Sequence, residues 1–391
     1  MNGLTSALAL ARAGFSVAMI EREAPGTMLT DAFDGRVSSI AWGSRLVLDG
    51  LGAWDAMMPH AQPILEIRVS DRDAPLFLHY DHKDVGDHPL GYILENRFIR
   101  RALDAAVAAQ PGIAVLAPAS VTATDRDATG ADLTLDDGRV LRCSLVVACD
   151  GFQSAVREMA GIGHRTIAYG QTGIVCTVEH EHDHRGIAHE RFLPGGPFAI
   201  LPVPGNRSSL VWTETDAIAR RVLELEPEAF LEEIAWRFGD FLGALKATGP
   251  VWSYPLTLVL AHRAIAPRLV LVGDAAHRIH PIAGPGYNLG IRDVAVLAEV
   301  LGDARRLGLD PGDAVALEDY ARRRRVDTFS LVAVTDGLNR LFSNAIGPLA
   351  LARDLGLGAV ERIPPLKRLF MRHAMGTVGR LPRLMHEPHR R

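Results

Sequence analysis

One stretch of the sequence places a carboxylate and two glycines in an order suited to binding a flat, anionic ligand. The apolar residues 269–272 predict a buried strand, and Gly273 and Asp274 follow it directly. In open α/β folds, ligands bind at the carboxyl ends of the parallel strands. We therefore expect the Asp274 carboxylate at that edge, where it could accept hydrogen bonds from sugar-like hydroxyl groups.

The glycines of this stretch precede a predicted helix. Gly284 and Gly286 have no Cβ, so the backbone there can approach a planar ligand closely. The helix begins with free N–H groups and a partial positive charge, which would stabilise negative charge on a bound ring system. A loop that only turns the chain would not need this order of strand, acid, glycines and helix.

The sequence resembles a known family at these positions. Residues 273–290 resemble the second FAD motif of the group A flavin monooxygenases, and residues 280–293 are similar to the ubiquinone-biosynthesis hydroxylases in particular. In that family the acid at position 274 contacts the ribityl chain, and the Pro-to-Gly stretch lies against the isoalloxazine ring. The resemblance implies that the FAD-binding residues of this stretch are Gly273, Asp274, Pro281, Gly284, Gly286, Tyr287 and Asn288.

A second stretch, residues 148–157, looks like the Asp-Gly motif of the same family. It follows the apolar residues 145–148 and contains Asp150 and Gly151, which the resemblance implicates in FAD and NAD(P)H contacts. Asp-Gly is also common in ordinary turns, so the pair is only moderately specific by itself. Together with the first stretch, and at this separation from it, the pair strongly indicates the same family.

Four further positions match the family in order. Gly3 corresponds to the last glycine of the dinucleotide-binding fingerprint, and Glu21 would bind the ribose hydroxyls of the adenosine. Arg36 resembles the arginine that reaches the pyrophosphate region, and Arg97 resembles another flavin-contacting position. Either arginine, taken alone, could be a surface charge.

The first residues of the sequence predict a helix up to Gly14 and then a strand over residues 15–20. A helix followed by such a strand is the second half of a βαβ unit. Family members open with a strand and a glycine-rich turn before the position of Met1. We expect that Met1 is an internal methionine of a longer protein, and that the chain starting here is unstable and binds FAD poorly.

The remaining elements predict an α/β fold. Short strands broken by Pro and Gly, over residues 64–70, 76–80, 198–202 and 209–213, indicate an antiparallel sheet, with a turn at 204–206. From Asp293 onward the pattern is helical, with Pro364 and Pro365 as a break. We expect a Rossmann-like FAD-binding domain of the hydroxybenzoate-hydroxylase type, with an inserted antiparallel-sheet substrate domain and C-terminal helices.

The predicted domains are discontinuous. The FAD-binding domain takes residues 1–61, 93–160 and 263–330, and its first strand is missing. The substrate domain takes residues 62–92 and 161–262, and the C-terminal helical region takes residues 331–391.

Composition excludes several classes of protein. The 391 residues carry a net charge of -4, which argues against a general nucleic-acid binder. No stretch approaches the roughly 20 apolar residues of a membrane span, and no signal peptide is apparent. We therefore expect a cytoplasmic protein with at most peripheral contact with the inner membrane. Residues 366–372, which are basic and apolar, could touch anionic lipid or form a packed helix.

Two charged runs suggest other sites. His180, His182 and His184 alternate as metal ligands on a strand would, but a solvated loop or edge is the preferred interpretation, and no metal site is predicted. Residues 322–325 are four arginines, which we interpret as a solvated helix face. The three cysteines fit neither a zinc site nor a disulfide framework.

The resemblance implies an FAD-dependent monooxygenase that uses NAD(P)H and O₂. A C4a-hydroperoxyflavin would hydroxylate the aromatic ring of a polyprenylated phenol in ubiquinone biosynthesis. No side chain in the sequence stands out as a general base. The alternatives are a flavin hydroxylase of a soluble aromatic compound, a flavin reductase of prenyl chains, and a non-catalytic flavoprotein scaffold among other ubiquinone-biosynthesis proteins.

Overall fold

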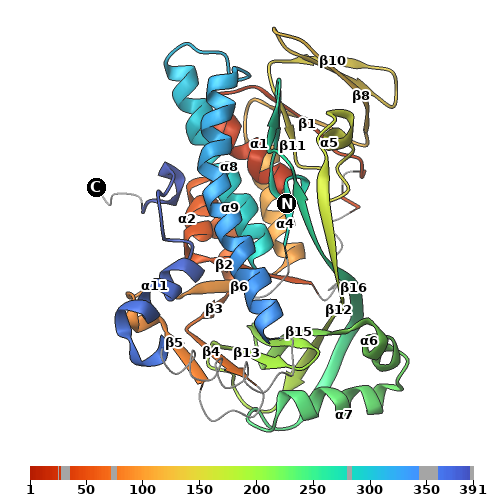
Figure 1. The fold of residues 1–391 in the computed structure, drawn as a ribbon, viewed down its shortest axis with the longest axis vertical. Helices are drawn as coiled ribbons and strands as arrows, with labels where there is room; N and C mark the ends of the chain where they lie inside the picture. The colour runs from red at the N-terminus through yellow and green to blue at the C-terminus, as the bar shows by residue number, and fades with distance from the viewer. Residues whose placement is uncertain (25, 28–35, 72–76, 280–283, 343–359, 388–391) are drawn as a thin grey trace.

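The computed structural model describes residues 1–24, 26–27, 36–71, 77–279, 284–342 and 360–387, and gives only the backbone at 285 and over 331–342. The predicted α/β fold is confirmed. Long helices and small parallel sheets lie at one end of the molecule, and a large sheet lies at the other (Figure 1).

The parallel strands are short and arise from the apolar runs in the sequence. Strand β1 (Val17–Ile20) pairs with β7 (Ile113–Leu116), and β11 (Val146–Ala148) pairs with β18 (Leu269–Leu271). The strand β17 (Ile265–Ala266) lies antiparallel to β18. Because β11 and β18 are parallel neighbours, Asp150 and Asp274 follow strands that end at one edge of the sheet.

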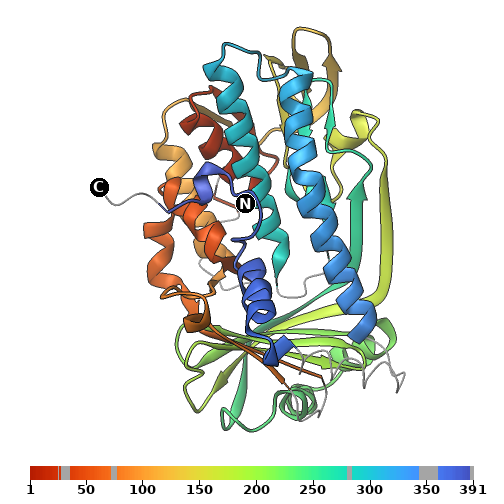
Figure 2. The same cartoon turned by 60° about the vertical axis from the view of Figure 1, so that its left-hand side comes forward.

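Helices from both ends of the chain form the core beside these strands. Helix α1 (Asn2–Arg12) packs along α8 (Pro285–Arg306), and α9 (Ala314–Phe342) packs along the other side of α8 (Figure 2). The same core cluster contains residues of α2 (Trp42–Gly50), α3 (Trp54–Met57) and α4 (Asn96–Ala109). The helix predicted at the start of the chain is confirmed by α1. From Asp293 onward the predicted helical pattern is confirmed within the described residues by α8, α9 and α11 (Pro364–Ala374), while residues 343–359 lie outside them.

The large sheet has eight strands. Their spatial order is β19 (His277–Arg278), β16 (Leu245–Ala261), β12 (His164–His180), β15 (Arg207–Thr215), β14 (Gly196–Val203), β13 (Ile187–Leu193), β4 (Glu66–Asp71) and β5 (Phe77–Asp81). The β13–β4 pair is parallel, and the other pairs are antiparallel. The turn predicted at residues 204–206 joins β14 to β15.

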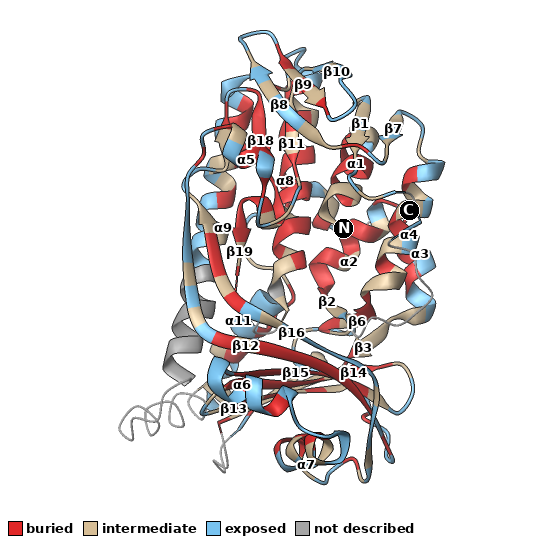
Figure 3. Ribbon diagram, turned by 90° about the vertical axis from the view of Figure 1, so that its right-hand side faces the viewer, coloured by how far each residue is buried: buried red, intermediate tan, exposed pale blue. Residues whose placement is uncertain are grey.

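The two faces of this sheet have different neighbours. Ile174, Phe198 and Trp212 pack against α6 (Asp216–Leu223) and α7 (Pro227–Phe238), which cover the outer face (Figure 3). On the opposite face, Ala188, Leu201 and Val203 pack toward Trp42 and Ile93 of the helical end. We call this second side the inner face.

Smaller elements complete the chain. Strands β2 (Val37–Ala41), β6 (Gly91–Glu95) and β3 (Gln62–Ile64) form a sheet between the two ends, so the strand predicted over 64–70 is divided between β3 and β4. A meander that the sequence did not suggest links β7 to β11. The remaining elements are α5 (Ala155–Met159), β8 (Val121–Arg126), β9 (Ala131–Leu135), β10 (Val140–Cys143) and α11 (Pro364–Ala374).

Candidate functional site

A short turn presents the first predicted acid. After β18, the 3-10 turn η3 (Gly273–Ala275) carries Asp274. Gly273 has φ +61°, and a Cβ there would lie 2.1 Å from the amide nitrogen of Asn2 at the start of α1. The Gly273 N–H donates to the Asp293 carboxylate on α8 at 2.9 Å. Only glycine fits this meeting point of η3, α1 and α8.

The Asp274 carboxylate has no protein partner among the described residues. Burial raises its pKa, and the positive charges of His277 and Arg278 only partly oppose that effect. No described residue donates a hydrogen bond to it. A half-buried carboxylate without donors is unfavourable, so this position suits a ligand that brings hydroxyl groups to it.

The start of α8 is open beside this acid. Gly284 has φ +61°, and a Cβ there would lie 3.1 Å from Ser39 Cβ of β2. A Cβ on Gly286 would meet no atom within 4 Å. No side chain caps the helix, so its first N–H groups can receive an anionic or hydrogen-bonding ligand. Pro281, which was also predicted to bind FAD, lies outside the described residues.

The side chains of Tyr287 and Asn288 are used by the protein itself. The Tyr287 hydroxyl lies 3.1 Å from the Thr5 hydroxyl of α1. The Asn288 side chain donates to the Ser39 carbonyl at 2.8 Å and accepts from the Ala41 N–H at 2.9 Å. These residues fasten the start of α8 to α1 and β2, so any contact they make with a cofactor would come from the backbone.

The Asp-Gly stretch is tied to the Asp274 turn by one arginine. Asp150 accepts a hydrogen bond from the Val156 N–H at 3.1 Å, and Gly151 has φ +85°. Arg157 is 1% exposed and donates to the carbonyl oxygens of Ala275, at 3.0 Å, and Phe152, at 2.9 Å. Arg157 lies within the recognised motif, but no role was predicted for it, because its partner Ala275 is distant in the chain.

Gly3 and Glu21 lie on α1 and directly after β1. A Cβ on Gly3 would lie 3.6 Å from Cys149 Cβ, which is ordinary contact between α1 and the end of β11. Glu21 is exposed and accepts a hydrogen bond from the Glu23 N–H at 3.1 Å. Its carboxylate is therefore accessible at the end of a parallel strand.

The two predicted arginines, Arg36 and Arg97, lie between the large sheet and the end of the molecule that holds the parallel strands, which we call the cofactor end. The Arg36 guanidinium carbon lies 6.0 Å from the ring centre of Trp252 on β16. Arg97 forms an ion pair with Glu95 at 2.7 Å, and Arg207 of β15 lies 3.5 Å from the other oxygen of Glu95. Since Glu95 is 3% exposed, Arg97 balances a buried charge.

A buried charge cluster behind the site was missed by sequence reasoning. Asp293 is 1% exposed and lies 2.8 Å from His277 Nε2, and it also pairs with Arg324 of α9. Burial would raise the pKa of Asp293, but the charges of His277 and Arg324 outweigh it and lower the pKa to about 2. The available signal was an acid among apolar residues of a predicted helix, because such an acid needs a partner.

This cluster corrects the interpretation of residues 322–325 as a solvated face. Arg322 and Arg325 are exposed, but Arg324 is 3% exposed, and Arg323 pairs with Glu299 at 2.7 Å. The arginines therefore hold α9 onto α8, since a buried guanidinium requires a carboxylate partner.

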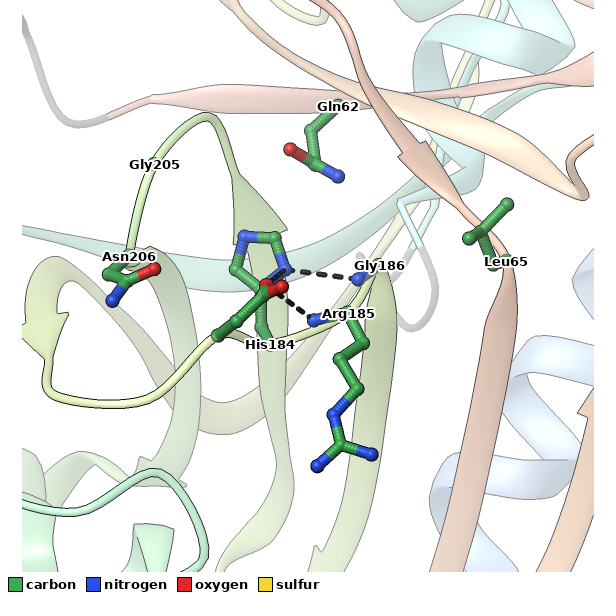
Figure 4. A pocket seen from close by; sticks show the side chains of 8 residues that line it. Gln62, Leu65, His184, Arg185, Gly186, Gly205 and Asn206 are labelled. Carbon is green, nitrogen blue, oxygen red and sulfur yellow. Dashed lines mark hydrogen bonds and ion pairs between the residues drawn. The ribbon is translucent and has the colours of Figure 1, made fainter.

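The histidines between β12 and β13 have structural partners. His180 bonds to the His182 carbonyl at 2.7 Å and to Ser208 at 3.1 Å, and His184 bonds to the Val203 carbonyl at 2.9 Å. His184 lines a pocket with Gln62 and other residues, none of which belongs to the predicted site (Figure 4). Nowhere in the described ranges do three His, Cys, Asp or Glu side chains gather as metal ligands would.

The described helices include none that is both long enough and apolar enough to cross a membrane.

Comparison with known sequences places the site in context. A family model described as "FAD binding domain" matches residues 1–327. The chain is 54% identical to ubiquinone hydroxylase UbiL of Rhodospirillum rubrum, over 98% of this chain and 90% of that protein. It is 36% identical to 3-demethoxyubiquinol 3-hydroxylase of Escherichia coli, over 96% of each chain. It is 30% identical to the human mitochondrial ubiquinone biosynthesis monooxygenase COQ6, over 88% of this chain and 83% of that protein.

Solved structures share the fold at lower identity. The p-nitrophenol 4-monooxygenase PnpA of Pseudomonas putida has a TM-score of 0.78 at 18% identity, over 97% of this chain and 96% of that chain. Klebsiella pneumoniae HpxO, solved with FAD and uric acid, has a TM-score of 0.70 at 19% identity, over 94% of each chain.

Proposed function

Because this chain belongs to the ubiquinone-biosynthesis hydroxylase family of FAD-dependent monooxygenases, we propose that it hydroxylates the aromatic ring of a polyprenylated phenol. NAD(P)H would supply the electrons and O₂ the oxygen atom. The observation that carries the proposal is the unpartnered Asp274 carboxylate beside the uncapped start of α8. The carboxylate accepts hydrogen bonds from hydroxyl groups, and the N-terminus of the helix favours a negatively charged ligand.

The residues present fit FAD. Asp274 would accept hydrogen bonds from the ribityl hydroxyls, and the backbone from Gly284 to Gly286 would lie against the isoalloxazine ring. Glu21 would bind the adenosine ribose, while Asp150, which follows the strand beside β18, would face the same edge. Gly3, Gly151, Gly273, Arg36 and Arg97 complete the proposed set, with Pro281, Tyr287 and Asn288. Bound FAD would supply the chemistry that activates oxygen, which no side chain of the protein can provide.

The helix α11 supports peripheral contact with a membrane. Leu369 is 52% exposed and Phe370 is 42% exposed, and the basic residues Arg368 and Arg372 are exposed beside them. Exposed apolar side chains among cations suit an anionic lipid surface, and a polyprenylated substrate would arrive from such a surface. Contact with other ubiquinone-biosynthesis proteins belongs to the same proposal and rests on the names of the relatives alone.

The proposal is tested by complementation of strains blocked at each ring hydroxylation of ubiquinone biosynthesis. We expect one strain to regain ubiquinone and to lose its accumulated precursor, as identified by mass. Purified protein supplied with FAD, NAD(P)H and O₂ should convert that precursor. Turnover of small soluble phenols alone would favour the hydroxylase of a soluble aromatic, and flavin binding without oxygen consumption would favour a scaffold.

A further inference from the structure

A glutamate on the inner face of the large sheet has no hydrogen-bond or ion-pair partner among the described residues. Glu190 lies on β13, is 8% exposed, and pairs across the backbone with Ala199 of β14 and Val69 of β4. Residues paired across adjacent strands project to the same side of a sheet, and neighbours along a strand project to opposite sides. His189 and Arg191 therefore point to the outer face, where His189 lies 4.6 Å from the ring of Phe241.

The position of Glu190 relative to the cofactor end follows from the strand register. One row runs across the inner face through Glu190, Ala199, Val211, Val175 and Trp252. The row ends at Trp252, whose indole ring lies beside Arg36 and which is 44% exposed. With strands about 4.8 Å apart, the row spans roughly 19 Å. Between its two ends stand only aliphatic side chains, which is the environment that an aromatic ring with a prenyl chain requires.

The next row supplies two further unsatisfied groups. Thr177 pairs with Ser209 on the inner face, and the two residues are 1% and 0% exposed. In the part of the chain that the structure describes, neither hydroxyl oxygen has a hydrogen-bond partner. Buried hydroxyls usually find partners, so these groups indicate a surface prepared for polar atoms of a ligand.

The Glu190 carboxylate differs from the other buried acids of the site. Glu95 and Asp293 are paired with arginines, whereas no described residue donates a hydrogen bond to Glu190. Burial alone raises the pKa of Glu190 to about 8. A side chain that titrates near the operating pH can exchange a proton efficiently with a substrate.

The other titratable groups near Glu190 come from β4, β5 and the segment before α11. Asp71 and Tyr80, on β4 and β5, project to the inner face, as their pairing shows. Glu361, before α11, is paired with Lys367 at 3.0 Å. Of α9, which packs against β14, only the backbone is described beyond residue 330. None of the named groups contributes to the pKa shift of Glu190.

We propose that Glu190 is the catalytic base that removes the phenolic proton of the substrate, an inference that rests on the proposed function. Ser209 and Thr177 would donate hydrogen bonds to oxygen substituents of the same ring. The phenolate that results is a far better nucleophile than the phenol, so the base would act on the hydroxylation step itself.

The proton transfers balance. The phenol O–H bond breaks, its proton moves to a carboxylate oxygen of Glu190, and its electron pair enters the ring. A ring carbon then takes one oxygen atom of O₂ as a hydroxyl group. NAD(P)H would supply two electrons and one proton through bound FAD, and solvent would supply a second proton, so that the transferred hydroxyl and the hydroxide from the other oxygen atom each carry a hydrogen. Loss of the proton from that carbon restores aromaticity and balances the hydroxide from the second oxygen atom, which leaves as water. Glu190 returns its proton to the ring oxygen.

The test compares Glu190→Gln with Glu179→Gln, a change of an exposed glutamate in the same sheet. In FAD-loaded protein we expect both variants to bind FAD and to accept electrons from NAD(P)H as the wild type does. Hydroxylation of the prenylated phenol should fall about 10²-fold in Glu190→Gln alone, with reduced oxygen released as hydrogen peroxide. The rise of the wild-type rate with pH near 8 should disappear in this variant.

A rescue experiment separates a base from a packing residue. A fluorinated prenylated phenol that is already ionised at pH 7.5 should bring Glu190→Gln close to the wild-type rate on that substrate. Glu190→Asp, which keeps a carboxylate, should retain the pH dependence at a lower rate. Flavin absorbance and melting temperature verify that each variant is folded.

Failure of the proposed function and failure of the role of Glu190 give different results. Wild-type protein that binds FAD but hydroxylates no phenol would contradict the proposed function and this inference with it. Wild-type hydroxylation matched by Glu190→Gln in rate and pH profile would overturn the role of Glu190 and leave the proposed function intact.

Discussion

His277 Nε2 lies 2.8 Å from the carboxylate of Asp293, and both side chains are almost completely buried. The same carboxylate accepts the Gly273 N–H and pairs with Arg324. One acid of α8 thus fixes the turn that presents Asp274, the strand β19 and the helix α9. The geometry of the proposed FAD site depends on a charge cluster that touches none of the proposed cofactor contacts except Gly273.

Asp293→Asn should destabilise the protein, because it removes the fully buried countercharge of Arg324 and leaves only Asp327, whose side chain is 30% exposed, to pair with it. We expect a loss of about 3–5 kcal/mol in unfolding free energy at pH 7, measured by urea denaturation. Since folding lowers the pKa of Asp293 to about 2, its contribution is present above the ordinary value of 3.8 and is lost as the pH falls through about 2. The exposed Asp87→Asn is the control, and equal stability of the two variants would contradict the cluster's role.

Gly286→Ala and Gly284→Ala should separate cofactor binding from folding. A Cβ at 286 meets no atom of the described residues within 4 Å, so the apoprotein should keep its melting temperature while FAD affinity falls at least tenfold. A Cβ at 284 is strained by the left-handed backbone and crowds Ser39, which should cost about 1–2 kcal/mol. Fluorescence titration with FAD and thermal melts of the apoproteins measure both effects. Unchanged FAD affinity in Gly286→Ala would show that the ligand does not approach this position.

Glu190→Gln should stabilise the folded protein, and more so at alkaline pH. Burial raises the pKa of Glu190 from 4.5 to about 8. Between these values the unfolded chain has released the proton and the folded chain still holds it, so the wild type loses stability as the pH rises. The advantage of the variant should grow between pH 5 and pH 8 to the order of a few kcal/mol. Melting curves at both pH values measure it, and a difference independent of pH would mean that Glu190 is not buried in this way.

Local patterns predicted the elements that carry the chemistry. The apolar run before Asp274 became β18, the run before Asp150 became its parallel neighbour β11, and the glycines at 284 and 286 begin α8. Periodicity and turn residues act over a few positions, so they are visible in a single sequence.

What the sequence did not reveal depends on partners far apart in the chain. Arg324 is buried because it pairs with Asp293 on another helix, although its neighbours in the sequence are those of a solvated helix face. Asn288 binds the backbone of Ser39, 249 positions away. Glu190 follows a histidine and precedes an arginine, and only the register of β13 on β14 places it on the inner face. Tertiary pairing of this kind leaves no local pattern.

The central claim is that Asp274 and the start of α8 bind FAD from its ribityl side. It is tested most directly by titrating FAD into Asp274→Ala and wild-type protein while following flavin fluorescence. We predict that the variant binds FAD 10- to 100-fold more weakly, since charged hydrogen bonds of about 1.5–3 kcal/mol are lost, while its apoprotein melts no lower than the wild type. Equal affinity for FAD in the two proteins would contradict this account.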